Sequence, residues 1–112
     1  MKKLAIALLC YAISLSTFAM TDKAKNELTK ALQGDYQTLR NVAYSMSNGI
    51  RGHDKNPIMA CALRKIILIV NSDETDAGDY SNEYVDCKAL PLIDSEKAWK
   101  ITLQLLPMIV SD

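Results

Sequence analysis

The order of apolar and polar positions along the chain predicts five helices joined by short polar segments. Apolar side chains recur at i, i+3, i+4 and i+7, a spacing that places them on one face of a helix. The predicted helices span residues 21–33, 35–48, 57–70, 80–90 and 94–106. We therefore expect an all-α fold, a compact bundle of about five helices arranged as helical hairpins.

Capping and breaking residues mark the ends of these segments. Asn56 followed by Pro57 is typical of a helix start, with an N-cap side chain and a proline at the first helical position. Glycine or proline follows the other segments, at Gly34, Gly49, Pro91 and Pro107. We expect each helix to end at these residues, the last of them at Pro107.

The third segment is apolar on most of its sides, which is typical of a helix buried at the centre of a bundle. Arg64 and Lys65 are its main polar interruptions, and Ile66 or Ile67 is expected in the core. Residues 66–70 form a short segment rich in β-branched side chains, so this segment also fits a strand. The cap at Asn56 and the length of the segment favour a helix.

Residues 1–19 have the composition of a secretion signal. Two lysines precede an apolar stretch that is too short for a comfortable membrane span, and small residues lead to a cleavage position after Ala19. We expect residues 20–112 to form a single helical domain in the periplasm, without a membrane span. Cys10 leaves open a lipoprotein signal, although Leu9 before it is not the usual small residue.

Cys61 and Cys87 are the two cysteines of the predicted mature chain. In an oxidising compartment, two cysteines in a small domain favour a disulfide over a metal or catalytic pair. Without the signal the chain has 11 basic and 13 acidic residues, a net charge of −2, which argues against nucleic acid as a partner. No residue cluster has zinc-ligand spacing, so we expect neither a metal nor a cofactor.

Part of the chain carries a repeat-like pattern of small residues and aromatics. It consists of Gly34-Asp35, Asn41-Val42-Ala43-Tyr44, Asn48-Gly49, Gly52, Ala60, Ala62 and Arg64-Lys65. This pattern resembles one Sel-one-like repeat, a relative of the tetratricopeptide helical hairpins. A second unit over residues 79–106 keeps only a hairpin and Trp99, so the resemblance implies a compact domain rather than a solenoid. It also implies a protein-binding role, since Sel-one-like proteins resemble adaptor and immunity proteins.

His53, the single histidine, lies in a polar loop between Gly52 and Asp54. As a general base it would need a nucleophile within reach, and Ser45 and Ser47 are close in sequence. Neither serine lies on a sharp turn of the kind that exposes a nucleophile. We therefore interpret His53 as a solvated loop residue and predict that the protein is not an enzyme.

The acidic segment 73–79 is open to three interpretations. Calcium loops place oxygen ligands at alternate positions, and Asp73, Thr75 and Glu83 only approximate that spacing. A helix-capping loop is the second interpretation. The third is a partner-binding edge, because an acidic loop steers a basic partner.

Eight residues are candidates for contact with a partner. They are Asp73, Glu74, Asp76 and Asp79 in the acidic segment, Arg51 and His53 in the second loop, and Tyr36 and Tyr80 near helix starts. Tyrosine is enriched at binding surfaces, and Tyr36 and Tyr80 are the tyrosines expected to be exposed. Tyr44, which matches the repeat pattern, is expected to pack within the hairpin.

These features favour a periplasmic protein-binding module as the function. The specific hypothesis is an immunity protein that occludes the cleft of a toxic effector, such as one delivered between bacteria by type VI secretion. The alternative is an envelope adaptor, assembly or stress protein. An enzyme acting on envelope material is a third, weaker hypothesis.

Overall fold

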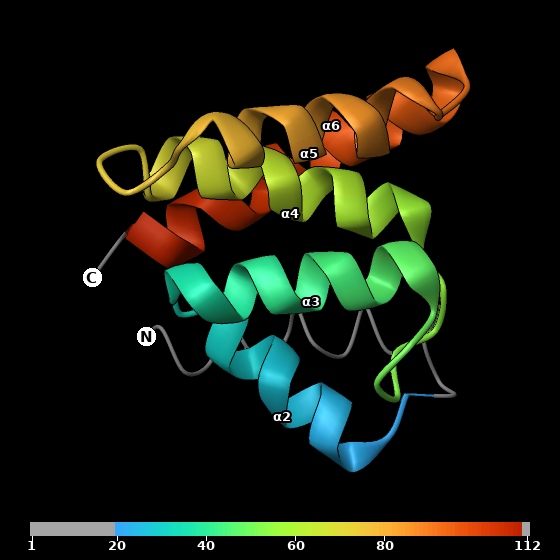
Figure 1. Ribbon diagram of the computed structural model, residues 1–112, viewed down its shortest axis with the longest axis vertical. Coiled ribbons are helices and arrows are strands. Elements are labelled where there is room, and N and C mark those ends of the chain that lie inside the picture. Colours follow the sequence, from blue (N-terminus) through green and yellow to red (C-terminus); the bar gives the residue numbers. More distant parts are fainter. Residues whose placement is uncertain (1–19, 111–112) are drawn as a thin grey trace.

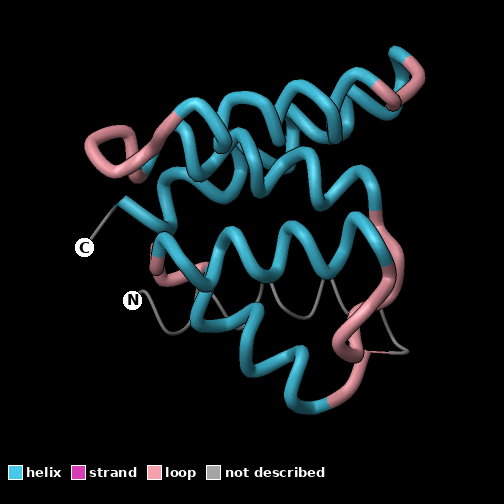
Figure 2. The backbone as a smooth tube through the Cα atoms, in the orientation of Figure 1, coloured by secondary structure: helices cyan, strands magenta, loops and turns pink. Residues whose placement is uncertain are grey.

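The computed structural model describes residues 20–110, and there it is all-helical, as the sequence predicts (Figures 1 and 2). Its helices are α2 (Asp22–Ala31), α3 (Tyr36–Asn48), α4 (Pro57–Val70), α5 (Ala77–Lys88) and α6 (Leu92–Val110). Short loops connect them into one bundle. The predicted signal, residues 1–19, lies outside the described residues.

Helix α4 is the centre of the bundle, with α3, α5 and α6 packed around it and α2 packed on α3 (Figure 1). Every residue from Met59 to Ile67 is buried, and Ile66 and Ile67 are exposed by 1% or less, as predicted. The strand alternative for residues 66–70 is wrong, because the helix continues to Val70.

Helix α6 runs parallel to α4, because contacts between the two helices advance along both in the same direction. The Thr102 hydroxyl donates to the carbonyl of Ala62 at 3.4 Å, and Ile109 lies against Gly34, close to Val70 at the end of α4. The sequence neighbours α3 and α5 form antiparallel hairpins with α4 (Figure 1).

Side-chain caps fix four of the helix starts. The oxygens of Thr21, Asp35 and Asn56 each accept a hydrogen bond from the backbone N–H three residues later, at 3.0–3.1 Å. Asp76 and Asp79 form a reciprocal capping box at the start of α5. The backbone N–H and hydroxyl of Thr38 both donate to Asp35 and hold the pKa of that carboxyl below its usual value.

Three glycines adopt the left-handed conformation that turns require, Gly34, Gly49 and Gly52. At Gly52 an added Cβ would overlap the hydroxyl oxygen of Thr21, so no other residue fits without a shift. The Thr21 N–H also donates to the Gly52 carbonyl at 3.1 Å. The start of α2 is thereby fixed to the loop that follows α3.

The two largest differences from the predicted helix ends are at the end of α6 and the start of α5. Pro107 lies inside α6 rather than at its end. Proline removes one backbone hydrogen bond, but Leu105 and Ile109 on either side of it are buried in the core, and their burial supports the helix across the interruption. Helix α5 begins at Ala77 instead of Tyr80, because the capping box starts it one turn earlier.

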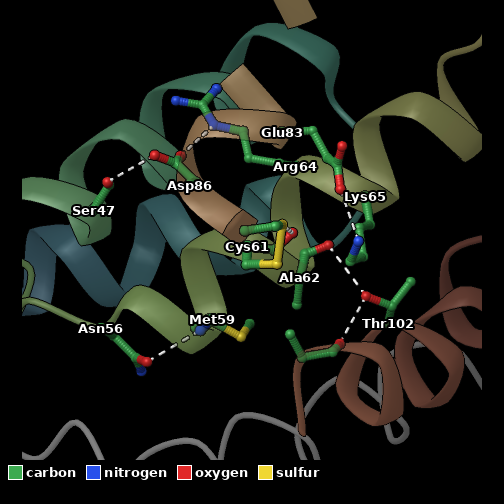
Figure 3. Close-up of a disulfide and its surroundings, with 12 residues drawn as sticks. Ser47, Asn56, Met59, Cys61, Ala62, Arg64, Lys65, Glu83, Asp86 and Thr102 are labelled. Atoms are coloured by element: carbon green, nitrogen blue, oxygen red, sulfur yellow. Dashed lines mark hydrogen bonds and ion pairs between the residues drawn. A yellow bond between two sulfur atoms is a disulfide. The ribbon is translucent and has the colours of Figure 1, made fainter. Parts of the chain in front are cut away.

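A disulfide and two ion pairs join α4 to α5 (Figure 3). The predicted bridge between Cys61 and Cys87 is present, with an S–S distance of 2.04 Å. Arg64 and Lys65 of α4 are buried and bind acidic side chains of α5. The pairs are Arg64 with Asp86 at 3.0 Å and Lys65 with Glu83 at 2.7 Å. None of the described helices is both long enough and apolar enough to span a membrane.

Candidate functional site

The candidate site is the end of the bundle formed by the α4–α5 loop, residues 71–76, and the first two turns of α5. The loop is fixed to the end of α4, since the carbonyl of Asn71 accepts the N–H groups of Glu74 and Thr75 at 2.8 and 3.1 Å. The side chain of Asn71 is buried and donates to the Gly34 carbonyl at 3.2 Å. Asp73, Glu74 and Asp76 are exposed on this ordered frame.

Asp79 does not belong to the exposed group, contrary to its assignment to an acidic loop. It lies in the first turn of α5 and is 2% exposed, because its carboxylate completes the capping box with Asp76. It also accepts the hydroxyl hydrogen of Tyr36, and the Arg40 guanidinium lies 3.2 Å away. Asp79 therefore anchors the start of α5 to α3.

Tyr36 is the α3 side of that anchor. Tyr36 was expected to be exposed, but it is half-buried, because its ring is covered and its hydroxyl is hydrogen-bonded to Asp79. The hydrogen bond to the Asp79 carboxylate stabilises the neutral phenol and raises the pKa of Tyr36 to about 12. The Arg40 guanidinium, 5.2 Å from the ring centroid, opposes this shift weakly.

Two tyrosines of α5 lie beyond the acidic loop and face solvent. Tyr80 is 57% exposed, as predicted, and Tyr84, one turn later, is 62% exposed. Residues four apart lie on one side of a helix, so the two rings form a continuous surface. The Lys88 ammonium lies 4.9 Å from the Tyr84 ring centroid and ends that surface.

Arg51 and His53 lie at the opposite end of the molecule, in the loop between α3 and α4 (Figure 1). His53 is 4% exposed, so its interpretation as a solvated residue is wrong. Its Nε2 lies 3.0 Å from Oε1 of Glu27, whose other carboxylate oxygen accepts from Arg51 at 2.8 Å. This cluster fastens the loop to α2 and is separate from the acidic end.

The serines considered beside His53 point elsewhere. The Ser45 hydroxyl donates to the Asn41 carbonyl at 2.8 Å, and the Ser47 hydroxyl donates to Asp86 at 3.1 Å. The structure therefore does not bring either serine to the histidine.

No family model matches the chain, and neither a curated protein nor a solved structure matches it. The resemblance to Sel-one-like repeats accordingly remains a prediction.

Two of the three side chains considered for calcium, Glu83 and Thr75, make other contacts. Glu83 binds Lys65 at 2.7 Å, and the Thr75 hydroxyl donates to the Ser72 carbonyl at 3.3 Å. Within residues 20–110, no three histidine, cysteine or acidic side chains are grouped so that they could hold a metal ion.

Of the eight candidate residues, four are exposed in the α4–α5 loop and the first turn of α5. These are Asp73, Glu74, Asp76 and Tyr80, which with Tyr84 we call the acidic–aromatic surface. Tyr84 was not among the candidates, although its i+4 spacing from Tyr80 was a usable signal. Tyr44 is 56% exposed, so the prediction that it packs within the hairpin is wrong.

Proposed function

We propose that the protein is a periplasmic protein-binding module that uses its acidic–aromatic surface, and specifically an immunity protein that occludes a toxic effector. The observation that supports it most is the combination of exposed carboxylates and exposed tyrosines on an ordered frame. Tyrosine anchors supply contact area, and carboxylates steer a basic partner and set its orientation. A loop that is already hydrogen-bonded loses little conformational entropy on binding.

The first test isolates and measures the partner. The wild-type protein is used as bait in a periplasmic extract, and the retained protein is identified and purified. Its affinity and association rate are then measured for wild type, for Asp73→Lys with Glu74→Lys, and for Tyr80→Ala. Asp76 is left intact because it caps α5, so that its replacement would also destabilise the helix.

We expect the double reversal to slow association about tenfold at low salt and less at high salt. We expect Tyr80→Ala to raise Kd by about tenfold or more. A matched control, Asp22→Lys with Asp54→Lys, makes the same change of net charge at the opposite end and should leave binding unchanged. Equal binding by both double variants would exclude this surface.

A second test concerns the immunity role itself. Cells that express the captured protein in the periplasm should lose viability, and co-expression of wild type should restore it. The Asp73→Lys, Glu74→Lys variant should protect less well, in proportion to its lost affinity. If the captured protein is harmless, the immunity function is refuted, although the proposal of a protein-binding module still stands.

A further inference from the structure

The outer side of α6 carries exposed aliphatic and charged side chains that the rest of the described chain does not cover. Ile93 is 64% exposed and Leu103 is 61% exposed, and Glu96 and Lys100 between them are also exposed. The opposite side of α6, with Ala98, Thr102, Leu105 and Ile109, is buried against α4 and its neighbours.

These four exposed residues are spaced as the contact line of a helix pair. Positions 93, 96, 100 and 103 are separated by three, four and three residues, the alternation that defines the a and d positions of a coiled coil. In such a seam each side chain meets the partner helix directly. We call the line of Ile93, Glu96, Lys100 and Leu103 the α6 seam.

The α6 seam is complementary to the seam of a second copy that runs in the opposite direction. Ile93 and Leu103 lie five residues on either side of position 98, and Glu96 and Lys100 lie two residues on either side. An antiparallel copy therefore sets Ile93 against Leu103 and Glu96 against Lys100, each contact occurring twice. This is the requirement of a two-fold interface, in which residue i contacts j and j contacts i.

The two charges are available for such a contact. Within the described part of the chain, no ion pair or hydrogen bond is made by the side chain of Glu96 or Lys100. A parallel pairing would place Glu96 against its own copy, which is repulsive, so the charge pattern selects the antiparallel orientation.

Apolar residues flank the seam and enlarge the surface. Leu92 is 88% exposed and Trp99 is 45% exposed, and the ammonium of Lys65 in α4 lies 4.1 Å from the Trp99 ring centroid. Together with Ile93 and Leu103 they give this face four large exposed apolar side chains.

We infer that the protein forms an antiparallel two-fold dimer through the α6 seam, with a second copy of this chain as the partner. The inference goes beyond the proposed function and does not rest on it, because the acidic–aromatic surface lies on the α4–α5 loop and α5. Each dimer carries two copies of that surface.

Analytical ultracentrifugation of the purified protein tests the inference. We expect wild type to pass from monomer to dimer with a Kd on the order of 10 µM. Glu96→Lys places lysine against lysine, and Lys100→Glu places glutamate against glutamate, so each should weaken the dimer about tenfold or more. Both positions are exposed, so circular dichroism should show an unchanged fold.

Mixing provides the decisive step. An equimolar mixture of the Glu96→Lys and Lys100→Glu proteins restores both opposite-charge contacts and should dimerise within about threefold of wild type. Lys25→Glu, at an exposed position of α2 and with the same change of charge as Lys100→Glu, is the matched control and should change Kd by less than about threefold. A wild-type monomer at about 1 mM, or a mixture that stays monomeric, overturns the inference.

Discussion

The two helices that adjoin α4 in the chain, α3 and α5, are held against it by different chemistry. Helix α3 buries Leu39, Val42, Ala43 and Met46, each exposed by 1% or less. Among the residues of α5, all of them described, Asp79 alone is buried. Helix α5 is instead attached by the disulfide and by the ion pairs of Arg64 and Lys65 (Figure 3).

This difference explains how α5 can present a binding surface. Apolar packing buries one side of a helix and tolerates small rotations, because it is not directional. A disulfide and hydrogen-bonded ion pairs fix both the distance and the rotation of a helix. Helix α5 therefore keeps Tyr80 and Tyr84 in solvent without needing an apolar face of its own.

The largest expected effect tests the apolar half of the comparison. Ile66→Ala removes a fully buried side chain from the central helix and should lower the free energy of unfolding by about 4 kcal/mol. Tyr84→Ala, on exposed α5, should change it by less than about 0.5 kcal/mol. Urea denaturation of both variants measures the contrast, and similar values for the two would refute it.

A smaller effect tests the attachment of α5 to α4 by the disulfide. Reduction of the Cys61–Cys87 bond should lower the free energy of unfolding by about 3 kcal/mol in the chain-entropy account of disulfides. The loss should be greatest in α5, so amide hydrogen exchange should speed up there and stay slow in α3. The Cys61→Ala, Cys87→Ala protein is the control, since reductant should leave it unchanged. Two free thiols in protein isolated without reductant would contradict the disulfide.

The smallest expected effect concerns the link between Tyr36 and Asp79. Because hydrogen bonding raises the pKa of Tyr36 from 10.0 to about 12, its stabilising contribution is complete below pH 10 and is lost as the pH rises through about 12. Ultraviolet titration of tyrosinate should show one late-ionising group that Tyr36→Phe removes. Ionisation of every described tyrosine near pH 10 would show that the bond does not persist in solution.

The sequence predicts the part of this fold that local signals control. The cap at Asn56, the turn at Gly49 and the apolar spacing of α3 each act within one or two helical turns, and the structure has helices where these signals occur. The α5 start and the path of α6 through Pro107 were missed. The α5 start depends on the reciprocal hydrogen bonds of the capping box. The path of α6 depends on core packing that outweighs the helix-breaking preference of Pro107.

Tertiary partners were harder to predict than helices. Arg64 and Lys65 are the main polar interruptions of an apolar helix, and the sequence near them does not show their partners. Asp86 and Glu83, 22 and 18 residues later, allow both to be buried. His53 is buried because Glu27, 26 residues earlier, reaches it. Of the predicted surface, Asp73, Glu74, Asp76 and Tyr80 are exposed at one end of the bundle because they are close in sequence.

The parallel pairing of α4 and α6 has a consequence for how the chain is made. The most apolar helix lies in the middle of the sequence, and the cluster around its Ala62 is completed by Cys87 and Leu90 and by residues from Ala98 onward. During synthesis, that side of α4 stays incompletely covered until nearly the whole chain has emerged. An incomplete chain would present it to other molecules, so safe delivery of this domain requires either rapid completion or a holding chaperone.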